Sequence, residues 1–290
     1  MLEAEFESLV PAGDFDRRTF LATSLGAGFA LAVQPVMAQT AIRTDDSGLL
    51  AGDIKVPASD GEVLAYRAQP ANAAKPAVVL VVSEIFGAHE YIRDTCRRLA
   101  KLGYCAIAPD LFTRQGDPRA LESVADILSR ITNRTPDAQV LSDLDACVAW
   151  AAAQGLDVDR LAITGFCWGG RITWLYCAHN PQVKAGIAWY GRLVGAVNAF
   201  TPRHPSDVVG QLKAPVLGLY GGLDTGIPLE TVESMQAALA TGSPAARLSQ
   251  IEIYDNAPHA FHADYRPSYR KEEAEDAWHR MAAWLANYLA

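Results

Sequence analysis

The chain has 290 residues, of which half are apolar and one fifth are charged. A chain of this length and apolar content can bury a large core without disulfides or metals, which excludes an intrinsically disordered protein. The formal net charge of −8 argues against a general nucleic-acid binder, because no excess of basic residues can neutralise phosphates. Five cysteines are too few for a disulfide scaffold.

The N-terminal segment resembles a bacterial export signal of the twin-arginine type. Arg17 and Arg18 directly precede a modestly apolar run, 20–33, and Val36-Met37-Ala38 supplies the small residues of a signal-peptidase site. The run is shorter than the roughly 20 residues that span a membrane, which disfavours a transmembrane helix. We therefore expect twin-arginine machinery to export the protein to the periplasm, or otherwise out of the cytoplasm, with removal of residues 1–38.

The remaining chain alternates strand-like and helix-like segments after a short N-terminal extension, 39–51. Strands are predicted at 52–56, 62–68, 77–82, 105–108, 161–164, 183–189, 216–220 and 248–254, the first two as an antiparallel hairpin. Helices with one apolar face are predicted at 91–102, 137–154 and 271–289. Residues 52–290 therefore read as a single three-layer α/β domain, in which helices flank a mostly parallel sheet.

The segment Gly165-Phe166-Cys167-Trp168-Gly169-Gly170 joins a predicted strand to a predicted helix. It matches the nucleophile-elbow pattern, with Cys167 in the position of the serine. The glycines are needed because the turn is tight, and the N-terminus of a helix favours a thiolate. The backbone N–H of Trp168 would point at a developing oxyanion. A buried structural cysteine in a glycine-rich turn is the alternative that this pattern leaves open.

Two further strand ends carry residues that could serve such a nucleophile. Asp224 follows the predicted strand at 216–220, and His259 follows the one at 248–254. Taken alone, each is typical of a solvated turn. Together with Cys167 they give the order nucleophile, acid, histidine, which is the order of the α/β-hydrolase triad. Because chemistry collects at the carboxyl ends of parallel strands, the sequence predicts a Cys–His–Asp triad there.

Three motifs resemble the dienelactone hydrolase family: the cysteine elbow, Ser83-Glu84-Ile85-Phe86-Gly87 and Pro109-Asp110-Leu111-Phe112. Residues from about 54 to 289 follow the layout of that family. The resemblance implies an α/β-hydrolase fold and a hydrolase of unsaturated lactones and esters, similar to carboxymethylenebutenolidase.

The resemblance also implies roles for the matched residues. Cys167 is expected to be the nucleophile, His259 the general base and Asp224 the group that orients it. Glu84 is expected to hydrogen-bond the resting thiol. The backbone N–H of Ile85 would complete the oxyanion hole with that of Trp168.

The role of Glu84 depends on whether the Cys167 thiol rests ionised or protonated. A carboxylate that follows a run of six apolar residues is costly to desolvate unless it has a partner, which supports a role at the site. A salt-bridged loop residue is the alternative. Either Cys167 and His259 rest as an ion pair and Glu84 is dispensable, or the thiol rests protonated against Glu84. We favour the second, because a protonated thiol resists oxidation outside the cytoplasm.

The sequence departs from the family in the residues that would bind a substrate carboxylate. The family arginine four residues after the catalytic histidine is replaced by Ala263. Arg266 and Arg192 could each supply that charge, and Tyr190 is a further candidate for substrate binding. An exported enzyme is separated from cytoplasmic aromatic catabolism, which favours a different ester or lactone.

The sequence thus predicts an ester or lactone hydrolase that forms a thiol ester on Cys167 without cofactor or metal. We expect a monomer whose only other partners are the export machinery and a small-molecule substrate, with no nucleic acid and, after signal removal, no membrane. One alternative is a general carboxylesterase or thioesterase on the same triad. Another is a noncatalytic ligand-binding or redox-responsive protein on the hydrolase fold, against which the intact catalytic set argues. The other cysteines are predicted to pack in the core: Cys96, Cys105, Cys147 and Cys177.

Overall fold

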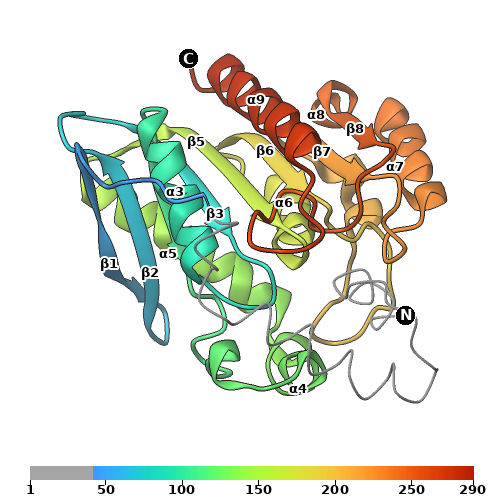
Figure 1. Cartoon of the computed structure of the whole chain (residues 1–290), viewed down its shortest axis with the longest axis horizontal. Coiled ribbons are helices and arrows are strands. Elements are labelled where there is room, and N and C mark those ends of the chain that lie inside the picture. Colours follow the sequence, from blue (N-terminus) through green and yellow to red (C-terminus); the bar gives the residue numbers. More distant parts are fainter. Residues whose placement is uncertain (1–41) are drawn as a thin grey trace.

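The computed structural model describes residues 42–290, so the predicted export signal lies outside the described residues. An eight-stranded sheet forms the centre of the described part, in the order β1-β2-β4-β3-β5-β6-β7-β8 (Figure 1). Its strands are β1 (Leu49–Ala58), β2 (Gly61–Pro70), β3 (Ala77–Val82), β4 (Cys105–Pro109), β5 (Asp157–Phe166), β6 (Val183–Trp189), β7 (Val216–Gly221) and β8 (Gln250–Tyr254). The β1–β2 and β2–β4 pairs are antiparallel, and every other pair is parallel.

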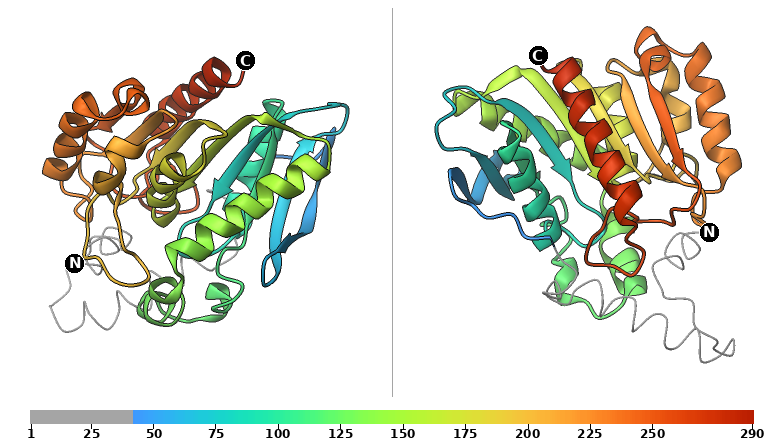
Figure 2. Two further views of the ribbon diagram at one scale, coloured as in Figure 1. Left: turned by 180° about the vertical axis from the view of Figure 1, so that it is seen from behind. Right: turned by 45° about the horizontal axis from the view of Figure 1, so that its top comes forward.

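Helices cover both faces of this sheet. They are α3 (Glu90–Lys101), α4 (Val124–Arg130), α5 (Asp137–Ala153), α6 (Trp168–His179), α7 (Leu229–Thr241), α8 (Pro244–Leu248) and α9 (Lys271–Tyr288). Helices α3 and α9 lie on one face and α5 and α6 on the other, while α7 and α8 lie beside the β7–β8 end (Figures 1 and 2). The predicted three-layer α/β fold with a mostly parallel sheet is confirmed.

Burial explains why the central strands read as unbroken apolar runs. Every residue of β3, β4 and β7 is buried, as expected for strands covered by helices on both faces. The hairpin strand β1 at the sheet edge alternates between exposed and partly buried residues instead. The four cysteines predicted to pack in the core are indeed buried thiols. Within residues 42–290, no helix is both long and apolar enough to cross a membrane.

Several predicted element boundaries differ from the structure; β5, for example, begins at Asp157 rather than at residue 161. The predicted strand at 248–254 begins too early, because residues Pro244–Leu248 form helix α8 and β8 starts at Gln250. Ser243 caps that helix by accepting a hydrogen bond from the Ala246 N–H (3.1 Å), and Pro244 follows it at the first helical position. Strand β1 begins at Leu49, before the predicted domain start at residue 52.

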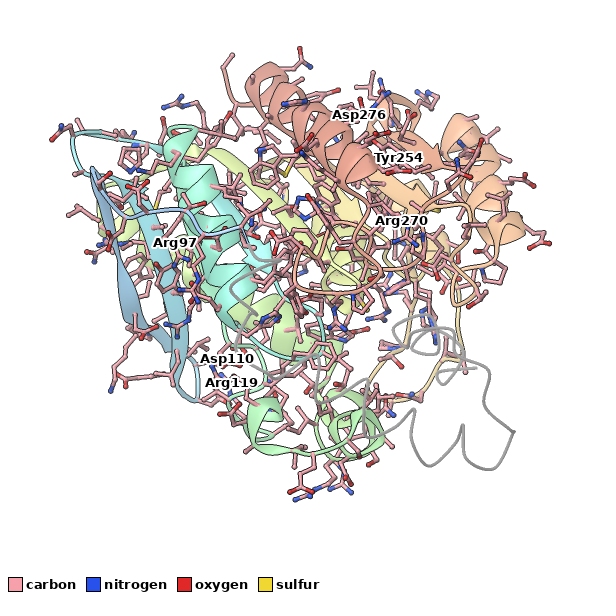
Figure 3. All side chains as sticks on the ribbon, in the orientation of Figure 1. Arg97, Asp110, Arg119, Tyr254, Arg270 and Asp276 are labelled. Carbon is pink, nitrogen blue, oxygen red and sulfur yellow. The ribbon has the colours of Figure 1, made fainter. Side chains whose placement is uncertain are left out.

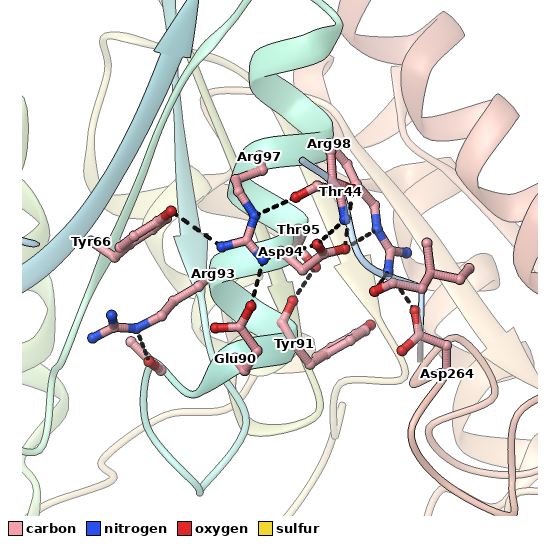
Figure 4. A network of polar contacts seen from close by, with 12 residues as sticks. Thr44, Tyr66, Glu90, Tyr91, Arg93, Asp94, Thr95, Arg97, Arg98 and Asp264 are labelled. Atoms are coloured by element: carbon pink, nitrogen blue, oxygen red, sulfur yellow. Dashed lines mark hydrogen bonds and ion pairs between the residues drawn. The ribbon is translucent and has the colours of Figure 1, made fainter. Parts of the chain in front are cut away.

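Residues 42–48 contact helix α3, and α3 in turn contacts a loop far along the chain (Figure 4). The Thr44 N–H donates to Asp94 of α3 (2.6 Å). Arg98, one turn further along α3, donates to Asp94 (2.6 Å) and to Asp264 (2.5 Å). Asp264 belongs to the loop between β8 and α9, so this network fixes that loop against the body of the domain.

A second hydrogen bond joins the strand before this loop, β8, to the helix after it, α9. The hydroxyl of Tyr254, the last residue of β8, donates to Asp276 of α9 (2.8 Å; Figure 3). The loop between β8 and α9 is therefore anchored on both sides.

Candidate active site

Three strand ends bring the predicted nucleophile, acid and histidine to one edge of the sheet. Cys167 directly follows β5, Asp224 follows β7, and His259 lies in the loop after β8. Because these strands are parallel, their carboxyl ends share an edge. All three side chains are buried.

Cys167 occupies the turn between β5 and α6 in an uncommon backbone conformation. Its φ of 53° and ψ of −114° lie in a region that costs a non-glycine residue on the order of 1–3 kcal/mol. The turn is held by hydrogen bonds from the Cys167 N–H to the Trp189 carbonyl (2.9 Å) and from the Arg171 N–H to the Cys167 carbonyl (3.2 Å). Strain at this position is typical of a nucleophile elbow.

Close backbone contacts explain the glycines on either side of Cys167. A β-carbon on Gly165 would overlap the carbonyl of Gly169, and one on Gly169 would overlap the carbonyl of Val82. Helix α6 therefore starts directly against the end of β3, and its N-terminus lies at the nucleophile. The partial positive charge of that N-terminus favours a thiolate on Cys167.

His259 and Asp224 form a buried hydrogen-bonded pair. The Nδ1 atom of His259 lies 2.6 Å from Asp224 Oδ2, while Asp224 Oδ1 accepts the N–H groups of Gly226 (2.9 Å) and Ile227 (3.2 Å). Burial alone would lower the pKa of His259, but the negative charges of Asp224 and of an ionised Cys167 outweigh it and raise the pKa well above its usual value. Asp224 thus fixes the orientation of the imidazole and stabilises its protonated, imidazolium form.

Glu84 and Cys167 occupy equivalent places after two paired strands. Val82 of β3 lies opposite Gly165 of β5, and each catalytic candidate comes two residues later. Both groups also lie close enough to the buried Tyr190 to affect its pKa. Burial raises the pKa of Tyr190 most, and the negative charges of Glu84 and Cys167 raise it further. The carboxylate and the thiol therefore belong to one cluster.

Three side chains surround the Glu84 carboxylate, which is buried. Glu84 Oε2 lies 3.1 Å from His89 Nε2, and the Tyr265 hydroxyl donates to Oε1 over 3.5 Å. The Arg266 Nε donates in turn to the Tyr265 oxygen (3.0 Å). Burial would raise the pKa of Glu84, but His89 and Arg266 more than compensate, so that its pKa lies below the ordinary value. Glu84 is therefore an ionised carboxylate.

Comparison with known proteins places this geometry in a family. The model of the dienelactone hydrolase family matches residues 63–289, which is most of the chain. The chain belongs to the dienelactone hydrolase family. It is therefore a hydrolase of the dienelactone hydrolase type on an α/β-hydrolase fold.

Individual relatives agree over nearly their whole length. A Methylorubrum extorquens protein named "Putative carboxymethylenebutenolidase" is 56% identical over 99% of this chain and 98% of its own. An Escherichia coli K12 protein of the same name is 50% identical over 92% of this chain and 98% of its own. A crystal structure of a "Putative Dienelactone Hydrolase" from Klebsiella pneumoniae has a TM-score of 0.80 and 53% identity, covering 83% of this chain and 99% of its own.

The two backbone amides predicted to form the oxyanion hole follow the ends of two neighbouring strands, β3 and β5. Ile85 directly follows Glu84 after β3, and Trp168 is the first residue of α6. Within residues 42–290, neither N–H group donates to a backbone carbonyl outside the hydrogen bonds of the helices and strands. The Trp168 ring packs against Phe112, with ring centroids 4.8 Å apart, and so keeps the start of α6 in place.

The candidates for substrate binding lie at different places. Arg266 is buried, and its pKa is raised, against the effect of burial, by Tyr265, Glu84 and Cys167. Tyr190 is also buried, with its ring edge-on to that of His259 at 5.1 Å. Arg192 instead influences His204, whose pKa it helps to lower after the larger effect of burial. Arg266 and Tyr190 therefore belong to the cluster around Glu84 and Cys167.

Sequence reasoning missed the two residues that hold Glu84. His89 carries no signal in the sequence, since it lacks even the spacing of a metal ligand. Tyr265 carried no signal beyond its position before Arg266. Gly87, in the turn between Glu84 and His89, was the one indication that the chain folds back at this point.

His262 lies near the site, but its contacts are with Trp278 and Tyr91. Its ring stacks on Trp278 (centroids 5.6 Å apart), and its Nδ1 accepts the Tyr91 hydroxyl at 2.5 Å. Burial first, and then the positive charge of Arg98, lower the pKa of His262 well below its usual value. This histidine is a neutral part of the aromatic packing. Among residues 42–290, no group of three or more His, Cys, Asp or Glu side chains could hold a metal ion.

Proposed function

We propose that the protein hydrolyses a lactone or ester through a covalent thiol ester on Cys167. The observation that carries this proposal is the buried Asp224–His259 pair (2.6 Å) at the same sheet edge as the strained Cys167 turn. A noncatalytic protein on a hydrolase fold would not be expected to keep a cysteine in a costly backbone conformation beside an oriented histidine.

The proposed reaction has two halves. In the first, the Cys167 sulfur attacks the substrate carbonyl, the Ile85 and Trp168 amides stabilise the oxyanion, and the C–O bond breaks as the imidazolium of His259 gives its proton to the leaving oxygen. In the second, the now neutral His259 takes a proton from water, the resulting hydroxide attacks the thiol ester, and the C–S bond breaks to release the acid and the thiolate. Asp224 stabilises the imidazolium that forms.

Glu84 is proposed to be the group that receives the thiol proton when substrate arrives. Its ionised carboxylate at the end of β3, level with Cys167 at the end of β5, supports this role. The S–H bond breaks and an O–H bond forms on Glu84, which moves the negative charge from the carboxylate to the sulfur.

Arg266 supports a substrate that carries negative charge near the reacting carbonyl. Its guanidinium lies in the Glu84 cluster, although Ala263 occupies the position of the family arginine. Once Glu84 is protonated, the charge of Arg266 is free to pair with an anionic substrate group. Unsaturated lactones that carry a carboxylate therefore head the substrate classes to be tested, ahead of neutral esters and thioesters.

A panel of lactones, aryl esters and thioesters offered to the purified protein tests this function. Cys167→Ala should abolish turnover while the melting temperature stays close to that of the wild type. Cys105→Ala, which removes a buried thiol at the amino end of β4, is the matched control and should keep its activity. Activity retained in Cys167→Ala would overturn the assignment.

We also propose export by the twin-arginine route, from the Arg17-Arg18 pair and the Val36-Met37-Ala38 cleavage site. Replacing both arginines with lysine should hold the precursor in the cytoplasm. Mass spectrometry of the exported protein should find Gln39 at its N-terminus, and an intact Met1 would contradict the predicted cleavage.

A further inference from the structure

The turn between β3 and α3 folds the chain back so that His89 returns to Glu84. The His89 N–H donates to the Gly87 carbonyl (2.9 Å), and the His89 carbonyl accepts the Arg93 N–H in the first turn of α3 (3.0 Å). Gly87 has a φ of +73°, a left-handed conformation that glycine adopts without strain. The backbone of His89 is therefore fixed on both sides.

Aromatic rings also fix the orientation of the His89 side chain. The Tyr91 ring stacks on it (centroids 6.0 Å apart, 25° between planes), and the Tyr265 ring meets it edge-on at 5.3 Å. Only 13% of the side chain is exposed. Its Nε2 faces Glu84 Oε2 at 3.1 Å, and because an ionised carboxylate can only accept, Nε2 is the donor.

Of the two side-chain hydrogen bonds described for the Glu84 carboxylate, the one to His89 is the shorter. The Tyr265 hydroxyl reaches the carboxylate only at 3.5 Å, and Arg266 acts on it by charge. Arg93, in the first turn of α3, has other partners: its Nε donates to the Ala88 carbonyl (3.2 Å) and its Nη2 pairs with Asp53 (2.8 Å). His89 therefore provides the short hydrogen bond that an isolated buried carboxylate would lack.

We propose that His89 is a positioning residue, which holds the Glu84 carboxylate in place to receive the proton of Cys167. This inference rests on the proposed role of Glu84. Without the donor at position 89, burial would shift Glu84 toward its neutral form, and a protonated carboxyl cannot accept a second proton. Removing the donor should therefore slow the proton-transfer step while leaving substrate binding nearly unchanged.

Two substitutions separate the hydrogen bond from the packing. His89→Phe keeps an aromatic ring between Tyr91 and Tyr265 but removes the hydrogen-bond donor. His89→Gln places an amide N–H near the position of Nε2. We expect His89→Phe to lower kcat at least tenfold with KM within about threefold, and His89→Gln to stay within about threefold of wild-type kcat. His179→Phe is the matched control, because His179 also pairs with a carboxylate, Asp145 (2.7 Å), but on the protein surface.

The pH profile gives a readout that packing alone would not move. Because Glu84 must be ionised to act, and losing its donor favours its neutral form, the acid limb of kcat/KM should move to higher pH in His89→Phe. If the phenylalanine variant does not fold, His89→Asn, whose shorter amide does not reach Glu84, should show the same loss and the same shift. Wild-type kcat and an unmoved acid limb in the folded variant would overturn the proposal.

Glu84→Gln, measured alongside, tells the two levels of failure apart. If Glu84→Gln turns over normally, the proposed role of Glu84 fails, and the inference about His89 falls with it. If Glu84→Gln is slow but His89→Phe is fast, only the inference about His89 is wrong. If both are slow, the double variant should be no slower than Glu84→Gln alone, since His89 acts through Glu84.

Discussion

The carboxylate of Asp224 and the imidazole of His259 meet across two loops, with Oδ2 and Nδ1 2.6 Å apart and both side chains buried. The second oxygen of Asp224 accepts two backbone amides from its own turn, Gly226 and Ile227. The turn after β7 thus fixes the carboxylate, and the carboxylate fixes the ring. His259 can rotate or change tautomer only by breaking this arrangement.

Replacing Asp224 with asparagine should therefore leave the fold intact but remove most of the activity. The amide can hold the ring in the wrong tautomer and cannot stabilise the imidazolium, so kcat should fall by about 10²–10⁴ with KM little changed. Steady-state kinetics on an activated ester measure this loss. Asp276→Asn, which alters a carboxylate bonded to Tyr254 on the surface of α9, should keep its activity. A kcat for Asp224→Asn within tenfold of wild type would refute the role.

Arg98 neutralises two buried carboxylates, and its removal should be more costly than the removal of either one. It lies 2.6 Å from Asp94 and 2.5 Å from Asp264, and the side chains of all three are at most 13% exposed. Arg98→Met leaves both carboxylates without this partner and should lower the free energy of unfolding by about 3–5 kcal/mol. Urea unfolding should show a smaller loss for Asp264→Asn, which leaves Arg98 paired with Asp94. An equal loss in the two variants would contradict this account.

The fold, and the shared sheet edge of Cys167, Asp224 and His259, could be predicted because their signals are local. The apolar run at Ala77–Val82 and the glycines around Cys167 report buried strands and a tight turn directly. Asp224 and His259 carry weak signals alone, and their order along the chain supplied the rest. The predicted strand at 248–254 begins too early because Leu248 is the last residue of helix α8, which Ser243 caps.

The environment of Glu84 could not be predicted, because its contacts come from residues that are distant or turned back. His89 reaches it only through the fold-back at Gly87, and Tyr265 lies 181 residues further along the chain. Whether such groups meet depends on tertiary packing, which sequence spacing does not record. The same is true of Arg266, whose burial beside Glu84 distinguishes it from Arg192 only in three dimensions.

His262 should make the folded state less stable in mild acid. Its pKa is lowered in the folded protein by burial and by Arg98, so the unfolded chain binds the extra proton as the pH falls below about 6.5. The free energy of unfolding should then decrease with falling pH, by up to about 1.4 kcal/mol per unit from this group. His262→Phe, which keeps the stacking on Trp278, should show a shallower dependence in urea titrations between pH 6.5 and 4.5. Parallel curves for the two proteins would exclude this contribution.

Glu84→Gln decides between the two resting states of the nucleophile. If Cys167 and His259 rest as an ion pair, wild-type Cys167 should be alkylated rapidly by iodoacetamide at neutral pH, and Glu84→Gln should turn over almost normally. If the thiol rests protonated beside the ionised Glu84, alkylation of the wild type should be slow. Turnover of a good ester by Glu84→Gln should then fall by at least about tenfold, because the amide can hydrogen-bond but cannot take a proton.

The surroundings of Glu84 favour the second outcome. The negative charge that His89 and Arg266 maintain on this carboxylate opposes a second negative charge on the sulfur until substrate is present. Glu90→Gln is the matched control, since Glu90 follows the same turn but pairs with Arg97 at the surface of α3. Fast alkylation of the wild type, combined with near-normal turnover in Glu84→Gln, would rule out the protonated resting thiol and leave the ion pair as the active form.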